Sequence, residues 1–404
     1  MGFGQGLSGL SAASQDLDVI GNNIANSATV GFKASSAAFA DVYAQSKVGL
    51  GVQVSEVKQR FNVGNIDVTG GQYDIAIDGE AGFFRVLGTS GEVQYTRNGQ
   101  FGINENYDIV NAQGARLTGF GVTATGQPST DLQALKLPTG NMPPLATSRI
   151  TTQTNLDANA PVISATFDAA DASTYTHALP LTVFDSLGNR HELTQYFVKQ
   201  AGQANESVWD VHYQFADGST AVNPAVHEVK FDDNGLMTQG QTVTLGVVSP
   251  GGANSPAADL SIDLSYSGST SFGSDFAPSF TQNGYTSGEF ASITIANDGA
   301  IQSNYTNGKS QVMGYVALAD FANLQGLKPV GGNAWIETGA SGQPVVGQPG
   351  TNGLAVLKGQ AVEASNVDMS QELVNMIIAQ RTYQANAQSI KTQDQILQTL
   401  ITMR

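Results

Sequence analysis

The 404-residue sequence contains no cysteine, which excludes disulfide bonds, thiolate metal ligands and a cysteine nucleophile. Charged residues make up only 13% of the chain, about half of the roughly 25% usual in globular proteins. Positive charge is scarcest: 18 Lys and Arg against 34 Asp and Glu give a formal net charge of -16. Because nucleic acids and anionic membrane surfaces attract Lys and Arg, we expect no nucleic-acid partner and no membrane-surface role.

Long apolar runs are also missing. None approaches the ~20 residues that span a bilayer, so we expect no membrane insertion. The amino end has neither a basic segment nor an apolar core, which argues against a cleaved secretory signal. The lack of cysteine is compatible with export through an oxidising space. If the protein is exported, we expect its amino end to be retained.

What the chain does contain is typical of a globular protein. Hydrophobic residues make up 41% and aromatic residues 8% of the sequence, which argues against disorder throughout. The length predicts two or three packed units, each large enough to bury a core.

The amino end carries a narrow apolar stripe at coiled-coil spacing, led in by Phe3 and Leu7. Successive members are spaced 3, 4, 3 and 4 residues apart, which predicts a helix with one apolar seam. The seam consists of Leu10, Ala13, Leu17, Ile20 and Ile24.

The carboxyl end carries a similar stripe, interrupted at Gln380 and Asp394. Ser370 is a plausible N-cap, and Glu372 lies in the first turn, where the helix dipole favours negative charge. The stripe consists of Met369, Leu373, Met376, Tyr383, Ala387, Ile390, Leu397 and Ile401. A stripe of this kind usually packs into an ordinary core. Two narrow seams at opposite ends of one chain instead favour pairing with each other and self-association.

Between the two ends the pattern is that of antiparallel hairpins. Runs such as "YDIAID" and "WDVHYQF" alternate apolar and polar residues, and pairs such as Asn98-Gly99 and Asp298-Gly299 mark turns between them. We therefore predict a mainly β protein with terminal α-helices that pair as a coiled coil. The predicted units are a helical domain (1–25 and 365–404), a connecting segment (26–71 and 359–364), a discontinuous β domain (72–147 and 282–358) and an inserted β domain (148–281).

Candidate sites for chemistry are weak. The stretch from Gly4 to Gly9 matches GxGxxG, but no strand precedes it, as a nucleotide site requires. His191 with Asp185 and Glu192 is better explained as a hairpin than as an acid/base group. His177, His212 and His227 have no metal-binding spacing, and Asp232 to Asn234 lacks the pattern of a calcium loop. We expect no catalytic, cofactor-binding or metal site.

Three asparagines, Asn22, Asn23 and Asn26, interrupt the predicted amino-terminal helix. Asparagine is a poor helix former, but its amide both donates and accepts hydrogen bonds. A buried asparagine can fix the register of a coiled coil. We therefore predict that these three side chains contact neighbouring chains.

Both ends resemble the flagellar rod and hook family of axial proteins. The amino-terminal match is "LSGLSAASQDLDVIGNNIANSATVGFKAS" (7–35), and the carboxyl-terminal match starts at "EASNVDMSQELVNMIIAQRTYQANAQ" (363–388) and continues to 404. Residues 82–120 and 317–338 resemble the family's shared β domain. Rod proteins of the family often have Asn-Thr-Pro-Gly-Phe at the first motif. This chain instead has Ser27-Ala28-Thr29-Val30-Gly31-Phe32. That departure and the large insertion favour the hook over the distal rod, which stays the alternative within the family.

The resemblance implies a structural subunit, not an enzyme, that self-polymerises into a curved tube joining rod to filament and transmitting torque as a universal joint. It implies an extracellular flagellar location and export by the flagellar type III apparatus without signal cleavage. The implied partners are further copies of the chain, the distal rod, the hook cap and the hook-filament junction proteins. A secreted β-rich adhesin explains the hairpins but not the terminal seams.

The subunit interface is predicted at both ends of the chain. Its residues are Leu7, Leu10, Leu17, Ile20, Asn22, Asn23, Ile24, Asn26, Leu373, Met376, Tyr383, Ile390, Leu397 and Ile401.

Overall fold

The computed structural model describes residues 3–42, 50–123, 125–138, 140–203, 205–216, 220–248, 250–251 and 255–402. The chain divides into two compact units. We call them the helix-bearing unit (Met1–Thr139, Ala291–Asn304 and Ser310–Arg404) and the inserted unit (Gly140–Phe290 and Tyr305–Lys309). The predicted inserted domain, 148–281, lies within the second.

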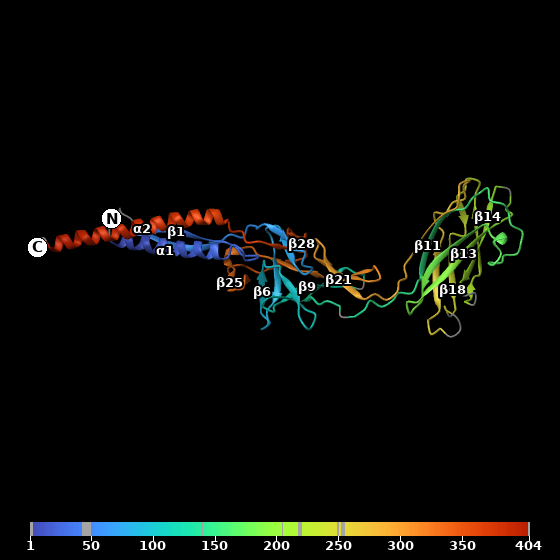
Figure 1. Ribbon diagram of the computed structural model, residues 1–404, viewed down its shortest axis with the longest axis horizontal. Helices are drawn as coiled ribbons and strands as arrows, with labels where there is room; N and C mark the ends of the chain where they lie inside the picture. The colour runs from blue at the N-terminus through green and yellow to red at the C-terminus, as the bar shows by residue number, and fades with distance from the viewer. Residues whose placement is uncertain are drawn as a thin grey trace. The chain divides into compact units, whose positions relative to one another are not determined.

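Two long helices, α1 (Phe3–Ala25) and α2 (Met369–Thr402), lie side by side in the helix-bearing unit (Figure 1). They run in opposite directions, because Gly6 near the start of α1 faces Ile390 late in α2, and Gly9 faces Asn386. The predictions of a mainly β fold and of paired terminal helices are confirmed.

Strands near the two ends of the chain pair with each other. β1 (Ser35–Val42) and β2 (Gly51–Gln59) form an antiparallel hairpin that lies on α1. β3 (Ile66–Val68) pairs with β29 (Ala361–Glu363), and β4 (Ile75–Asp78) pairs with β28 (Val356–Gly359). The predicted connecting segment, 26–71, therefore contains ordered strands, and its second piece supplies β29.

The rest of the helix-bearing unit is an antiparallel sheet whose main path runs β21-β22-β23-β9-β5-β6-β26-β25. An aromatic cluster fills its core, with the Phe83 and Trp335 rings 5.6 Å apart, edge to face. The strands and one short helix are β5 (Phe83–Leu87), β6 (Val93–Thr96), β7 (Phe101–Ile103), β8 (Ile109–Asn111), β9 (Arg116–Val122), β10 (Pro128–Ala134), β21 (Phe290–Ile295), β22 (Ala300–Tyr305), β23 (Ser310–Val316), β24 (Leu318–Asp320), η2 (Leu324–Gly326), β25 (Lys328–Gly331), β26 (Ala334–Ile336) and β27 (Val345–Gly347).

The inserted unit is built from two five-stranded sheets among its described residues, ordered β15-β18-β19-β11-β20 and β12-β13-β14-β16-β17. Its elements are β11 (Arg149–Asn155), η1 (Ala172–Thr174), β12 (His177–Phe184), β13 (Arg190–Gln200), β14 (Ser207–Phe215), β15 (Val222–Asn223), β16 (Val226–Phe231), β17 (Met237–Gln239), β18 (Thr242–Val247), β19 (Leu260–Ser265) and β20 (Ala277–Gln282).

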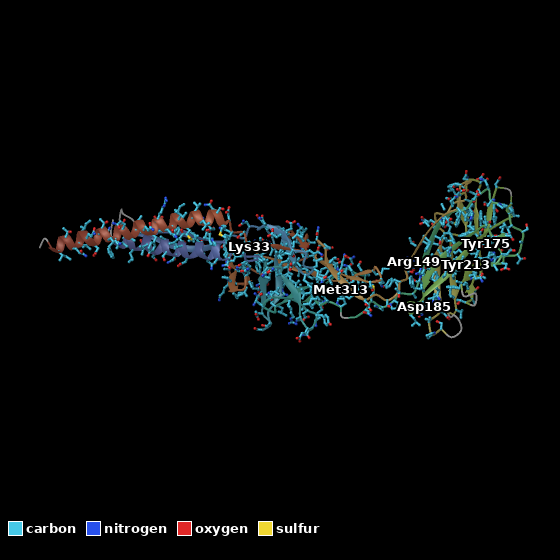
Figure 2. The ribbon with its side chains drawn as sticks, in the orientation of Figure 1. Lys33, Arg149, Tyr175, Asp185, Tyr213 and Met313 are labelled. Carbon is cyan, nitrogen blue, oxygen red and sulfur yellow. The ribbon has the colours of Figure 1, made fainter. Side chains whose placement is uncertain are left out.

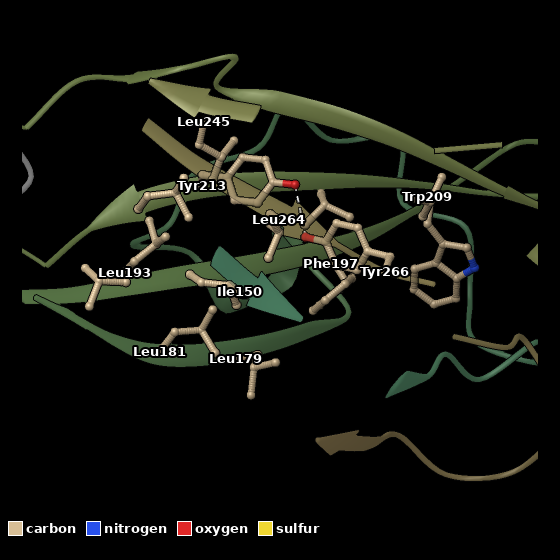
Figure 3. Packing of buried hydrophobic residues seen from close by; sticks show 14 of the residues in the cluster. Ile150, Leu179, Leu181, Leu193, Phe197, Trp209, Tyr213, Leu245, Leu264 and Tyr266 are labelled. Atoms are coloured by element: carbon tan, nitrogen blue, oxygen red, sulfur yellow. Dashed lines mark hydrogen bonds between the residues drawn. The ribbon is translucent and has the colours of Figure 1, made fainter. Parts of the chain in front are cut away.

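The core of the inserted unit lies between these sheets (Figure 3). Along β14, Trp209, Val211 and Tyr213 point inward in turn, as the alternation of the sequence predicts. The buried hydroxyls of Tyr213 and Tyr266 share a hydrogen bond of 3.0 Å, and Tyr266 also donates to Gln195. The polar ends of these two tyrosines therefore find partners inside an apolar core.

Several hairpin turns share the same pattern of hydrogen bonds between a side chain and the backbone. An Asn or Asp side-chain oxygen accepts hydrogen bonds from the backbone N–H groups two and four residues later, and the residue three positions later has a positive φ. The four turns begin at Asn104, Asn111, Asp185 and Asp232, with Tyr107, Gly114, Gly188 and Gly235 at the positive φ. This explains the hairpins predicted at Asp185 and at Asp232.

Candidate functional site

The terminal helix pair is held together by small residues on α1. A Cβ atom added at Gly9 would lie 2.9 Å from Nδ2 of Asn386, and one added at Gly6 would lie 3.0 Å from Cγ1 of Ile390. Real Cβ atoms are essentially never closer than 3.0 Å to another heavy atom. Gly6 and Gly9 of the GxGxxG match therefore serve close helix packing, whereas a Cβ atom added at Gly4 would meet nothing within 4 Å.

On α1, the predicted interface residues divide by their burial. Ile20 is buried against the rest of its own unit, and Leu10, Leu17 and Ile24 are half-buried. Leu7 is 54% exposed, although it continues the same stripe. The helix therefore satisfies most of its seam within one chain, and its first turns leave apolar surface uncovered.

The three asparagines are engaged in hydrogen bonds within the chain or exposed. Asn23 is 1% exposed; its amide nitrogen donates to the Ser35 carbonyl at 2.7 Å, and its oxygen accepts from the Ser35 N–H at 2.9 Å. The prediction that Asn23 contacts a neighbouring chain is wrong, because both ends of its amide join α1 to β1. Asn26 donates to the Asn22 carbonyl and accepts from Thr29, as expected at a helix end, while the side chain of Asn22 is exposed.

On α2, most of the predicted interface residues are exposed. Leu373, Tyr383, Leu397 and Ile401 all lie at the surface, whereas Met376 and Ile390 are half-buried. The predicted stripe was interrupted at Gln380 and did not include its neighbour Ala379. In the structure Ala379 is buried, whereas Gln380 is exposed. The predicted stripe also missed further exposed apolar side chains on this helix: Val374, Ile377, Ile378 and Ile396.

Lys33, which Figure 2 labels near the point where the helices meet the β strands, belongs to a buried charge cluster. The Glu363 carboxylate, on β29, accepts from Lys33 Nζ at 2.6 Å, from Arg97 Nη1 at 3.2 Å and from the Gly64 N–H at 2.9 Å. All three charged side chains are at most 1% exposed. We call Lys33, Arg97 and Glu363 the Glu363 cluster.

The two cations of the Glu363 cluster share a single carboxylate. Burial lowers the pKa of Lys33 and of Arg97 from their usual values, and Glu363 opposes that effect in both. Backbone carbonyls supply the remaining acceptors: Asn62 for Lys33, and Gly79 and Glu80 for Arg97. Since Glu363 is only six residues before α2, the cluster fixes the base of that helix.

The start of α2 is held by a second set of polar contacts. Asp368, not the predicted Ser370, caps the helix: its carboxylate accepts from the N–H groups of Ser370 and Gln371 at 2.9 and 3.1 Å. Glu372 lies in the first turn as predicted and pairs with Arg60 at 2.9 Å. Burial, and then the Glu372 charge, raise the pKa of Asp16 on α1.

The residues considered for chemistry have structural contacts. His191 Nε2 lies 3.0 Å from Asp185 beside the β12–β13 turn, and Asp232 holds the β16–β17 turn. Across the described ranges, no group of three or more His, Cys, Asp or Glu residues is placed to hold a metal ion. Among the same residues, neither long helix is apolar enough to cross a membrane.

Four family models match consecutive parts of the chain. The model described as "Flagella basal body rod protein" matches residues 5–33, and "Flagellar hook protein FlgE/F/G D1 domain" matches 76–159. "Flagellar basal body protein FlaE D2 domain" matches 155–285, and "Flagellar basal body rod FlgEFG protein C-terminal" matches 358–403. Together they cover both helices and parts of both units.

Proteins named flagellar hook proteins are matched over nearly their whole length. The chain is 45% identical to the protein named Flagellar hook protein FlgE of Salmonella typhimurium and 43% identical to that of Escherichia coli, covering 100% of each chain. The Borreliella burgdorferi protein of the same name is 30% identical over 99% of this chain and 98% of its own. A crystal structure of Helicobacter pylori flagellar hook protein FlgE2, 13% identical, shares the fold with a TM-score of 0.55 over 74% of this chain and 100% of that one.

Proposed function

The chain belongs to the flagellar hook protein family, and we propose that it polymerises with copies of itself into the curved, tubular hook of the bacterial flagellum. The observation that carries this function is the 45% identity over the full length of both chains. It includes the terminal helices and the inserted unit together. The distal rod alternative is less supported, because the relatives matched over the full length are named hook proteins.

We further propose that the terminal helix pair is the main polymerisation surface. Large apolar side chains exposed on α2 support this assignment, since burying each one contributes about 1.5–3 kcal/mol. Such a surface is costly to leave in water on a single chain. The interface residues predicted on α2, above all Leu397 and Ile401, are available for contact with other copies.

The finer assignments are also proposals. In this role the subunit has no catalytic activity and transmits torque as part of a flexible joint between rod and filament. Its neighbours at the ends of the polymer are the distal rod, the hook cap and the hook-filament junction proteins. It reaches the outside of the cell through the flagellar type III apparatus without signal cleavage.

A pair of substitutions on the exposed seam of α2 tests the polymerisation surface. Leu397→Asp with Ile401→Asp should abolish tube formation by the full-length chain, because charged groups cannot be buried unpaired. Electron microscopy of the purified protein provides the readout, and unchanged tryptophan fluorescence shows that both units stay folded.

The matched control places the same charges elsewhere on the same turns. Gln395→Asp with Thr399→Asp lies on the other side of α2 and should allow curved tubes. Tubes from the Leu397 and Ile401 variant would refute the assigned surface, and straight polymers from the unaltered chain would favour the distal rod.

A further inference from the structure

The helix pair has an uncovered apolar tip. Gly6 of α1 faces Ile390 of α2, and the two helices run in opposite directions. Phe3 lies three residues before Gly6, so it faces a position three or four residues after Ile390, at about residue 393 or 394. Leu397 and Ile401 continue the Ile390 face beyond that point and are 52% and 75% exposed. We call Leu397 and Ile401 the tip.

A groove opens toward the other end of the same helices. It is walled by α1, by the β1–β2 hairpin and by α2, and encloses about 390 Å³, the room of about a dozen water molecules. The residues that define it here are Ala12, Ala13, Phe39, Val52, Ile378 and Thr382. Apart from Asp16 and Thr382, the residues that line the groove are apolar or glycine.

The chemistry of the groove fits an apolar occupant. Phe39 and Ile378 are both about half exposed, so the groove presents large side chains that a ligand could cover. Asp16 lies at the edge of this lining, and burial and then the Glu372 charge raise its pKa. An apolar side chain entering the groove would displace water from Phe39, Ile378 and the small side chains of α1.

We propose that the tip of one subunit docks into this groove on a second copy of the chain. The inference rests on the proposed function, since it names which surfaces of the polymerising helix pair meet. Leu397 and Ile401 would pack against Phe39, Ile378 and the small side chains of α1.

The positions of the two surfaces explain why the occupant is another copy. The tip and groove lie on one continuous helix, with Thr382 and Gln398 about 24 Å apart, so a subunit cannot fill its own groove. A contact between two different patches of the same chain leaves a free tip and a free groove at the ends, and can repeat without limit. A different protein in the groove would instead stop the growth of the polymer.

The absence of cysteine allows a direct test by disulfide trapping. In the full-length chain, Thr382→Cys with Gln398→Cys places one thiol at the groove and one beside the tip. A disulfide needs Cα atoms within about 7 Å, so these two thiols cannot join within one chain. After tube assembly and oxidation, we expect a ladder of multimers on a non-reducing gel, and each single-cysteine variant can yield no more than dimers.

A matched pair provides the control. Thr392 is about 120° around the helix from Gln398 and about 140–180° from Leu397 and Ile401, so Thr382→Cys with Thr392→Cys should lose the ladder while still forming tubes. Tubes without a ladder from the Gln398 pair, or equal ladders from both pairs, would overturn the docking but leave the proposed function intact. Failure of the unaltered chain to form any polymer would refute both.

Discussion

The terminal helix pair and the inserted unit use apolar residues in opposite ways. The inserted unit places its large side chains between two sheets, where Trp209, Phe197 and Ile262 are fully buried. Helix α2 instead exposes Leu397, Ile401 and several other apolar side chains along its length. One region therefore completes its core within a single chain, and the other leaves large apolar side chains exposed, which is what the proposed polymerisation would use.

The two regions also differ in how they use charge. The helix-bearing unit buries the Glu363 cluster, with two cations on one carboxylate, at the base of the helices. Burying charges is costly and gives little net stability, but removing one partner of a buried pair is strongly destabilising. The attachment of α2 therefore relies in part on one buried carboxylate, whereas the core of the inserted unit is a distributed apolar cluster.

Glu363→Gln should give the largest effect on stability and should act on the helix-bearing unit alone. Removing the negative charge leaves Lys33 and Arg97 buried without their paired carboxylate, which costs about 3–5 kcal/mol. The chain has two tryptophans, Trp335 in the helix-bearing unit and Trp209 in the inserted unit. In a Trp209→Phe background, tryptophan fluorescence reports only on Trp335. The unfolding midpoint measured in this way should move to a lower denaturant concentration.

Glu372→Gln is the matched control for that prediction. Its partner Arg60 is half exposed, so the pair should contribute less than about 1 kcal/mol. The Glu363→Gln and Glu372→Gln variants should therefore differ in the denaturant concentration at which the Trp335 signal changes. Equal midpoints would contradict the idea that the Glu363 cluster stabilises the start of α2.

Asp185→Ala should destabilise only the inserted unit, by about 1–2 kcal/mol, because the side chain accepts four hydrogen bonds from Leu187, Asn189 and His191. Unfolding followed by Trp209 in a Trp335→Phe background measures this. Asp185→Asn keeps the oxygen that accepts from the two backbone N–H groups, and should lose less. A shift in the Trp335 transition would contradict the separation of the two units.

The contribution of Asp185 should also disappear in acid. Burial by itself raises the pKa of this carboxyl group, but the hydrogen bonds from His191, Asn189 and Leu187 together bring it below 3.8. A carboxylate with a lowered folded pKa stabilises the protein above the unfolded value and loses that effect as the pH falls through the folded value. The wild type and Asp185→Ala should therefore converge in stability well below pH 3.8.

His177→Phe should give the smallest effect, visible only in mild acid. Burial lowers the pKa of His177, which stacks on Phe276 with ring centroids 4.3 Å apart. The stability of the wild-type inserted unit should thus be full above pH 6.5 and decline as the pH falls through 6.5. The variant should reduce that decline in the Trp209 transition; an identical decline in both proteins would count against a role for His177.

The sequence was sufficient to predict the elements whose signals are local. Alternating residues in β14 and the Asp–Gly and Asn–Gly turns identify the hairpins, and the spacing of Leu10, Ala13 and Leu17 identifies α1. These patterns involve only residues close together in the chain, so they can be interpreted without knowing the tertiary contacts.

The elements that were missed depend on distant partners. Lys33 and Glu363 are 330 residues apart, and isolated charges in a sequence are normally solvated, so nothing local indicates their burial. Asn23 was assigned to neighbouring chains because its partner, Ser35, belongs to a strand of small residues with no clear apolar alternation. On α2, Ile390, Leu397 and Ile401 share one face, but only Ile390 lies alongside the described part of α1, so their different burial depends on where the partner helix begins.

The main segment of the inserted unit, Gly140–Phe290, begins and ends close to one pair of hydrogen-bonded residues. Met142 and Gly288 exchange both backbone hydrogen bonds, at 2.8 and 3.1 Å, and Leu145 pairs with Tyr285 in the same antiparallel sense. Opposed residues of this type have Cα atoms about 5.5 Å apart. A chain running straight from residue 142 to residue 288 would need to span only that gap. The segment between them is therefore a cassette, whose length and sequence can be exchanged as one piece without altering the connectivity of the rest.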